Sequence, residues 1–332
     1  MSAIRKSISA KLVAAAVLAF GALAGTAQAQ SDATTNWPNR PVKLIVPFAP
    51  GAGADIGARL AANALSTKWK QSVIVENRPG GDSLIAIKAV IAAKDDHQLL
   101  FAASGNFTPH PYRHESLGYK RERDLLPVAR FSNTIVTLAV ASSLNVNTLP
   151  ELIAAAKKRP NELNVVMVPG ITEMVWDSFA KTEGVNITKV PFTNVSQGAS
   201  EMLSGRVHIA MAGLAIIQPV LQSGKVKLIA VTSRERVSLL PDVPTVFEAG
   251  VPSVWLEGLV GVFASPAMSE ALRARVGKDI ADVARMPDIA ERLAATGQVP
   301  NPGGSEEFSA DIAAQEKQVA EMAKIIGLRK LD

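Results

Sequence analysis

The sequence predicts an α/β protein of two lobes, each a mostly parallel sheet flanked by helices. Short apolar runs alternate with segments of helical spacing along most of the chain, as they do where helices cover a parallel sheet. The alternation occurs in two blocks of similar size, and 332 residues exceed what one small domain needs. Hydrophobic residues make up 48% and charged residues 20%, which suffices for two buried cores and excludes wholesale disorder.

The first block has the order strand, helix, strand, helix, strand. Short apolar runs predict strands at 44–48, 73–76 and 99–103. Between them, apolar residues recur at helical spacing and predict helices at 55–69 and 83–93. A long extended stretch is expected at 128–141. This βαβαβ order is typical of a parallel sheet covered by helices.

The second block opens with a capping box, Thr148-Leu-Pro-Glu151, which predicts a helix at 149–159. Strands are then expected at 163–168, 187–192, 207–212 and 227–232, with helices at 171–183, 196–204 and 214–223. A proline-rich connection at 240–252 and a strand at 258–264 precede helices at 269–285, 287–295 and 305–326.

The last helices have little sheet of their own, so we assign them to the first lobe. The expected first lobe comprises residues 30–135 and 255–332, and the second lobe residues 136–254. The chain would therefore cross between the lobes near residues 135 and 255, which predicts a hinge there.

Residues 1–29 have the features of a secretory signal peptide. Arg5, Lys6 and Lys11 precede an apolar segment that is too short to span a bilayer, and Ala27-Gln28-Ala29 is a small-x-small cleavage site. We expect cleavage after Ala29 and a periplasmic mature protein. Without these three basic residues the formal net charge of +5 falls to +2. Together with 5% aromatic residues, this predicts no nucleic-acid partner.

Several kinds of chemistry are excluded or disfavoured by the residues present. The chain has no cysteine, which excludes disulfides, thiol catalysis and thiolate zinc sites. It lacks the motifs of serine hydrolases, zinc peptidases and phosphate-binding loops. His110 and His114 have the i, i+4 spacing of helical metal ligands, but Pro109 and Pro111 disfavour a helix there. We therefore expect no metal, no cofactor and no catalytic residue.

The candidate ligand site is a glycine-rich loop between the first strand and the first helix, Pro47-Phe-Ala-Pro-Gly-Ala-Gly-Ala-Asp55. Small residues allow a ligand to approach the backbone, and a helix N-terminus favours an anion. The loops Ser104-Gly105-Asn106 and Asn77–Gly81 follow neighbouring strands and would converge on the same anion.

Two alternatives remain for this loop. One is a tight turn in which Asp55 caps the helix locally. The other is a dinucleotide site built on Gly51, Gly53 and Glu76, although the third glycine of that fingerprint is Ile56 here, and Gly57 lies one position too late.

Longer motifs carry a family resemblance. Trp37-Pro38 with Arg40–Phe48, the loop Gly51–Asp55, the segment Val75-Glu-Asn-Arg-Pro-Gly80 and the stretch Leu240–Gly250 after Val231-Thr-Ser match one family in order. Through them the mature chain resembles the extracytoplasmic solute-binding receptors of tripartite tricarboxylate transporters. The resemblance implies a two-lobed periplasmic binding protein with its ligand between the lobes. It also implies that loop amides and bridging waters hold the ligand carboxylate.

The resemblance implies ligand contacts from both lobes. In the first lobe these are Phe48, Ala49, Gly51, Ala52, Gly53, Asp55, Ser104, Gly105 and Asn106. In the second lobe the sequence departs from the family pattern, and the corresponding candidates are Gly170, Ile171, Thr172, Phe192, Thr193, Ala212 and Gly213. Ala212 stands where the family often has an acid. These mainly apolar side chains favour a monocarboxylate with a neutral or aromatic far end.

We expect a monomeric, non-enzymatic binding protein that captures a small organic carboxylate and delivers it to the subunits of a membrane transporter. Two other classes remain open. One is an exported enzyme on the same scaffold, and the other is a receptor that reports its ligand to a membrane signalling protein.

Overall fold

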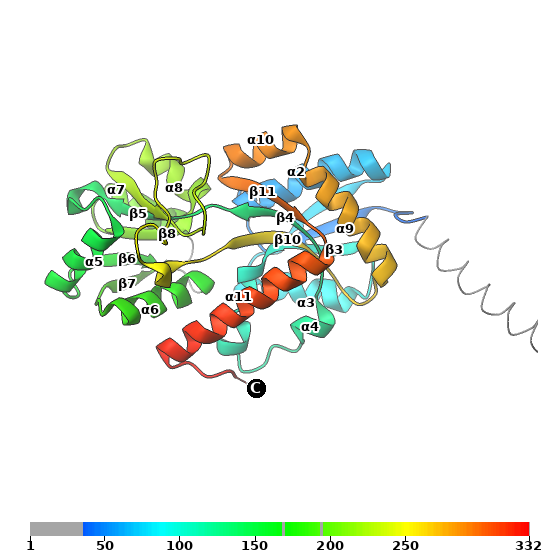
Figure 1. Ribbon diagram of the computed structural model, residues 1–332. Coiled ribbons are helices and arrows are strands. Elements are labelled where there is room, and N and C mark those ends of the chain that lie inside the picture. The colour runs from blue at the N-terminus through cyan, green and yellow to red at the C-terminus, as the bar shows by residue number, and fades with distance from the viewer. Residues whose placement is uncertain (1–35, 168–169, 193–194, 332) are drawn as a thin grey trace, which may run out of the picture.

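The computed structural model describes residues 36–167, 170–192 and 195–331. Figure 1 shows two lobes side by side, each a sheet with helices on both faces. This confirms the expected α/β fold of two lobes. The expected signal peptide lies outside the described residues. None of the helices in the described ranges combines the length and apolarity that crossing a bilayer requires.

The first lobe is built on a six-stranded sheet of order β11-β4-β10-β3-β1-β2. Its strands are β1 (Val42–Val46), β2 (Val73–Asn77), β3 (Gln98–Ala103), β4 (Leu126–Thr134), β10 (Gly258–Ala264) and β11 (Gln298–Gly303). β1 pairs in parallel with β2 and β3. β10 and β11 run antiparallel to their neighbours. The pairing in this sheet is therefore mixed, where the sequence predicted mostly parallel strands.

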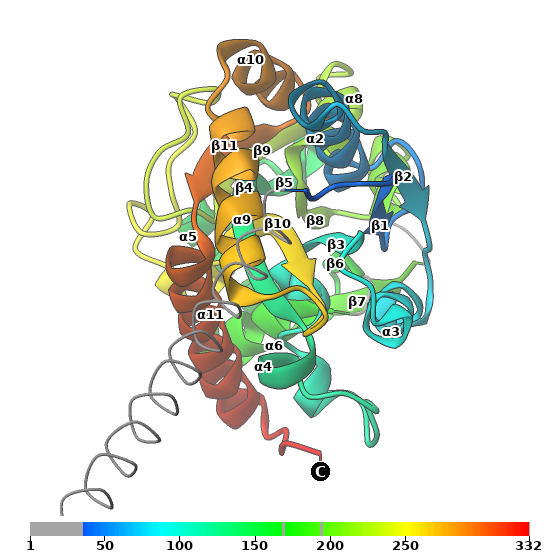
Figure 2. The ribbon, with the colours of Figure 1, turned by 90° about the vertical axis from the view of Figure 1, so that its right-hand side faces the viewer.

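Helices cover both faces of the first sheet, as Figure 2 shows with this lobe toward the viewer. The helices are α2 (Gly53–Trp69), α3 (Leu84–Ala93), the short α4 (Arg121–Asp124), α9 (Glu270–Ala284), α10 (Pro287–Ala295) and α11 (Ser305–Ile326). Leu44 and Ile45 of β1 point to opposite faces. Leu44 packs in the core with α2, α9 and α10, and Ile45 in the core with α3 and α11.

The second lobe is built on a five-stranded sheet of order β7-β6-β8-β5-β9. Its strands are β5 (Val136–Ala141), β6 (Asn164–Met167), β7 (Thr188–Pro191), β8 (Ile209–Gly213) and β9 (Val226–Val231). Its helices are α5 (Leu149–Lys158), α6 (Ile171–Glu183), α7 (Val195–Leu203) and α8 (Leu214–Leu221). β6 pairs in parallel with β7 and β8, while β5 runs antiparallel to β8 and β9.

The chain first passes from one sheet to the other at a buried residue, Ile135. The sequence predicted a single extended stretch over 128–141, but β4 and β5 belong to different sheets and Ile135 separates them. Its N–H donates to the carbonyl of Gly297 at 3.0 Å, and its carbonyl accepts the N–H of Leu214 at 2.8 Å. The crossing is thus held from both lobes. The lobe boundaries drawn from the sequence remain a proposal that this distribution of strands supports.

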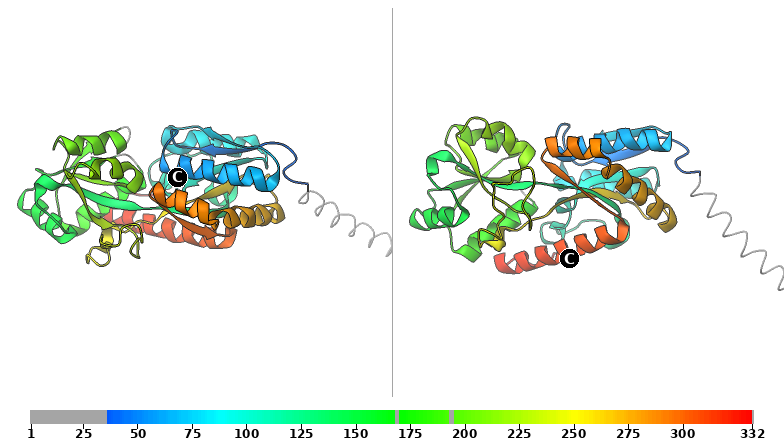
Figure 3. Two further views of the ribbon diagram at one scale, coloured as in Figure 1. Left: turned by 90° about the horizontal axis from the view of Figure 1, so that it is seen from above. Right: turned by 45° about the horizontal axis from the view of Figure 1, so that its top comes forward.

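Helix α11 contacts both lobes. Near its start, Phe308 and Ile312 lie in a first-lobe core. Near its end, Val319, Met322 and Ala323 lie in the second-lobe core with α5 and α6. Figure 3 shows the helix, in red, running along both lobes. The sequence predicted the helix but assigned it to the first lobe alone.

Candidate functional site

A cavity of about 300 Å³ lies between the lobes. First-lobe residues that line it are Phe48, Ala52, Gly53, Ala54, Asp82, Ala103, Gly105, Asn106 and Thr296. From the second lobe and the crossings come Thr134, Val136, Gly170, Ile171, Thr172, Gly213, Ala215, Ile216, Leu256, Glu257, Gly258 and Leu259. None of these described lining residues is a lysine, arginine or histidine.

Three helices begin at the wall of this cavity. They are α2, α6 and α8, and residues of each first turn line the cavity. The residue that precedes each helix provides no side-chain hydrogen bond to the first turn. Free N–H groups and the positive end of the helix dipole attract an anion. The cavity can therefore hold an anionic group from either lobe without a cationic side chain.

The glycine-rich loop is held in shape by Asp55, which is 1% exposed. Its carboxylate accepts hydrogen bonds from the Gly51 N–H at 2.8 Å, Arg59 Nε at 3.0 Å and Asn77 Nδ2 at 2.7 Å. Burial alone would raise the pKa of Asp55, but these hydrogen bonds outweigh it and hold the pKa below its usual value. Asp55 thus supports the loop from behind and does not line the cavity.

Of the other loop residues, some line the cavity and some do not. Phe48, Ala52 and Gly53 line the cavity, whereas Ala49 and Gly51 are exposed and outside it. Asn77 also donates to the Phe48 carbonyl at 2.9 Å, which ties the second strand end to the first.

The loop after β3 approaches the second lobe at Gly105. A Cβ there would lie 2.7 Å from Cγ2 of Ile171, so any larger residue would force Ile171 or the loop to shift. Asn106 donates to Ser83 Oγ at 2.8 Å, and its own buried Oδ1 has no hydrogen-bond partner among the described residues. Ser104 is buried and points away, donating from Oγ to Oε1 of Gln315 in α11 at 2.6 Å.

In the second lobe, only some of the candidates line the cavity. Gly170, Ile171, Thr172 and Gly213 line it. Ala212 is buried in β8, outside the lining. Phe192 is partly buried and packs against a core cluster of this lobe, and Thr193 lies outside the described residues. The position of Ala212 therefore does not face the cavity, contrary to what the resemblance implied.

Several residues that line the cavity were not among those predicted from the sequence. Ala215 and Ile216 are in the first turn of α8, so they were predictable from their place at a helix N-terminus, as Gly53 was. Thr134 and Gly258 lie at the ends of the crossing strands β4 and β10. Asp82 comes directly after the loop Asn77–Gly81, and no local sequence pattern identifies it as a residue that lines the cavity.

Asp82 belongs to a hydrogen-bonded cluster with His110 and His114. The Asp82 carbonyl accepts from His110 Nε2 at 2.9 Å, and its carboxylate accepts from His114 Nε2 at 2.9 Å. His110 Nδ1 lies 3.0 Å from the Tyr119 hydroxyl. Because a carbonyl only accepts, Nε2 carries the proton of His110 and Nδ1 accepts from Tyr119.

This cluster fixes the loop under the cavity. Asp82 and Ser83 have positive φ angles of 53° and 68°, which non-glycine residues adopt only with support. Ser83 in turn holds Asn106. Although three potential ligand atoms of Asp82, His110 and His114 lie within 4.8 Å of one another, their hydrogen bonds account for this arrangement without a metal.

Glu76, the acid that a dinucleotide site would need to bind ribose, forms ion pairs with two side chains outside the cavity. Glu76 pairs with Arg78 at 2.6 Å and Lys43 at 3.4 Å, and it does not line the cavity.

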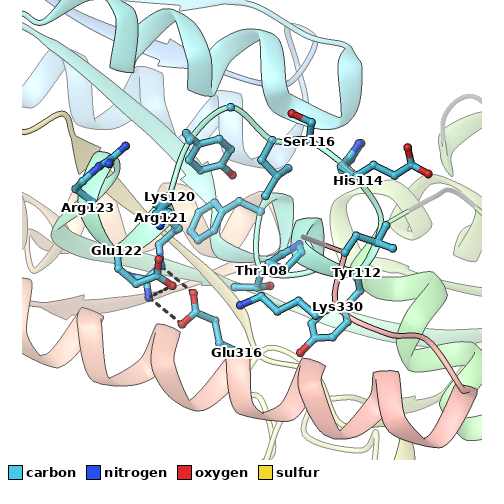
Figure 4. A pocket seen from close by; sticks show the side chains of 17 residues that line it. Thr108, Tyr112, His114, Ser116, Lys120, Arg121, Glu122, Arg123, Glu316 and Lys330 are labelled. Carbon is cyan, nitrogen blue, oxygen red and sulfur yellow. Dashed lines mark hydrogen bonds and ion pairs between the residues drawn. The ribbon is translucent and has the colours of Figure 1, made fainter.

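A larger hollow of about 870 Å³ lies along the loop 107–123 and α11 (Figure 4). It contains none of the predicted site residues. Within it, Arg121 makes a bidentate contact with Glu316 of α11 at 2.8 Å. The inter-lobe cavity is therefore the better candidate.

Comparisons with known proteins agree on one family. A UPF0065 protein of Bordetella bronchiseptica is 28% identical over 96% of this chain and 93% of its own length. An R. palustris protein solved with adipate has 28% identity and a TM-score of 0.79, covering 88% of this chain and 99% of that one. MatC of Rhodopseudomonas palustris, solved with malate, has 25% identity and a TM-score of 0.73, covering 87% of this chain and 100% of that one.

The family model described as tripartite tricarboxylate transporter family receptor matches residues 57–328. This span includes the second lobe, the first lobe from α2 onward and most of the cavity lining. The chain therefore belongs to the tripartite tricarboxylate transporter receptor family of periplasmic solute-binding proteins.

Proposed function

We propose that this protein captures a small organic carboxylate in the inter-lobe cavity and delivers it to the membrane subunits of a tripartite transporter. The carrying observation is that three helices without side-chain caps begin at a cavity whose described lining has no cationic side chain. Main-chain donors can bind a carboxylate there at little cost, because they need no charge partner of their own.

We favour a dicarboxylate over the monocarboxylate that the side chains alone suggest. α2 begins on the first-lobe side of the cavity, and α6 and α8 begin on the second-lobe side. One anionic group can thus be held by each lobe, although the second lobe offers few polar side chains. The relatives solved with adipate and malate support the same class of ligand.

We also propose that the protein is exported to the periplasm, that its two lobes close on the ligand, and that it binds the ligand without converting it. Cleavage after Ala29 would release a periplasmic protein, and intact mass of the periplasmic fraction tests this. The two lobes would close about the crossings near Ile135 and residue 255, and monomeric protein should become more compact in small-angle scattering when ligand is added. Delivery to a transporter, rather than to a signalling protein, requires that uptake of the ligand depend on this receptor.

The deciding experiment identifies what the protein holds. Purified protein is denatured and the released small molecules are analysed by mass spectrometry. A thermal-shift panel then compares adipate and malate with their diamides and with glutamate. We expect the dicarboxylates to stabilise the protein and the neutral diamides to have no effect. Stabilisation by the diamides as strong as by the acids would contradict recognition of an anion.

A matched pair of glycine variants locates the site. Gly53 lines the cavity, and the nearest atom to a Cβ there is Gln298 Nε2 at 3.8 Å, so Gly53→Val should fold. Gly304 precedes α11 with open space around it, and Gly304→Val is the control. We expect only Gly53→Val to abolish the ligand-induced shift. Conversion of a bound ligand to product would instead favour the enzyme alternative.

A further inference from the structure

An ion-pair network crosses from one lobe to the other at the rim of the cavity. Arg113 follows the 3₁₀ turn His110–Tyr112 of the first lobe. Its Nη1 donates to Glu173 of α6 in the second lobe at 3.0 Å, and its Nε lies 3.4 Å from the Asp82 carboxylate. Asp82 lines the cavity, and Glu173 directly follows the lining residue Thr172.

Each end of this contact is anchored within its own lobe. On the first-lobe side, the Arg113 N–H bonds to the His110 carbonyl at 3.0 Å, and His110 is itself fixed to Asp82. On the second-lobe side, Lys189 bonds to Glu173 at 3.2 Å and to Asp177 at 2.9 Å. The Arg113 guanidinium therefore links the first-lobe carboxylate of Asp82 with the second-lobe carboxylate of Glu173.

The Arg113–Glu173 ion pair is partly buried, so solvent weakens it less than it would weaken a fully exposed pair. The side chains of Arg113 and Glu173 are 22% and 23% exposed. Burial would raise the pKa of Glu173, but Arg113 and Lys189 outweigh it and keep the pKa below its usual value. A pair in this position is screened less than an exposed one. If the lobes separated, Glu173 would keep Lys189, whereas Arg113 would lose its second-lobe partner.

We propose that Arg113 is a positioning residue that latches the lobes in the closed state by pairing with Glu173. The latch adds to the affinity for whatever ligand the cavity accepts, because closure is part of binding. The contribution of the latch to ligand affinity rests on the proposed function, whereas the latch itself does not. The closed-to-open ratio of the ligand-free protein does not depend on which ligand the protein takes.

The test uses the absence of native cysteine. In the mature full-length protein, Asn63→Cys in α2 and Lys157→Cys in α5 place exposed spin labels on opposite lobes. Pulsed dipolar EPR then reports the inter-lobe distance distribution in dialysed, ligand-free protein. We expect Arg113→Met and Glu173→Gln each to reduce the closed-to-open ratio about three- to fivefold. The double variant should be no more open than either single variant.

Lys189→Met is the matched control, because it removes a cation from Glu173 without touching a contact between lobes. It should leave the distribution unchanged. High salt should open the wild type and leave Arg113→Met unaffected, and Arg113→Lys should restore part of the closed population. Circular dichroism verifies that each variant is folded. An Arg113→Met distribution identical to wild type, or equal opening in Lys189→Met, would overturn the latch even if the ligand assignment were correct.

Discussion

The stability of this protein should fall between neutral and mildly acidic pH because of His110. The side chain is 1% exposed, and burial lowers its pKa from 6.5 to about 4, although the charge of Asp82 partly opposes the shift. As pH falls below 6.5, the unfolded chain therefore takes up a proton that the folded chain refuses. The 2.5 pH units between 6.5 and 4, at about 1.4 kcal/mol each, would give about 3.5 kcal/mol. Because the folded His110 is itself half protonated at pH 4, the expected loss there is about 3 kcal/mol.

The measurement is the free energy of unfolding in urea at pH values from 7.5 to 4, for the wild type and for His110→Gln. Glutamine keeps hydrogen-bonding capacity but does not titrate, so the variant should lose less stability than the wild type on acidification. The difference between the two curves isolates His110, because the other titrating groups are common to both. Parallel curves from pH 7.5 to 4 would refute the argument that His110 stays neutral in the fold.

Three further changes test the site and its supports. Gly105→Ala places a Cβ 2.7 Å from Ile171, so ligand affinity measured by calorimetry should drop by about tenfold. Adding Ile171→Ala should restore the affinity, and no rescue would contradict this contact. Asp55→Asn turns an amide N–H toward donors and should reduce the free energy of unfolding by about 2–3 kcal/mol, measured in urea; a loss below about 0.5 kcal/mol would show that the loop is held otherwise. Gly297→Ala, at φ 67° with a Cβ 2.8 Å from the Ala215 N–H, should weaken both stability and binding, and an unchanged melting temperature would argue against a tight crossing.

Local sequence signals predicted many elements closely. The capping box at Thr148 predicted a helix at 149–159, and α5 spans Leu149–Lys158 with the Thr148 hydroxyl accepting the Glu151 N–H. The C-terminal helix was expected at 305–326, and α11 spans Ser305–Ile326. Such features depend on neighbours within a few residues, so the sequence alone specifies them.

The candidate site was predictable where it consists of backbone. Gly53 and Gly105 were identified because their small size permits close approach, and both line the cavity. Asp55 was identified through the family motif and Ser104 as a hydrogen-bonding loop residue, yet both turn inward to hold loops. The direction of a side chain depends on partners such as Asn77 and Gln315, which are distant in sequence.

The amino-acid order thus determined the α/β class, the capped helices and the glycine-rich loops, because these follow from periodicity and local backbone preference. Tertiary structure decided the rest. Ile135 divides one extended run between two sheets, α11 joins the cores of both lobes, and Arg113 meets Glu173 across 60 positions of sequence. These features arise from contacts between distant segments, whose partners no local pattern specifies.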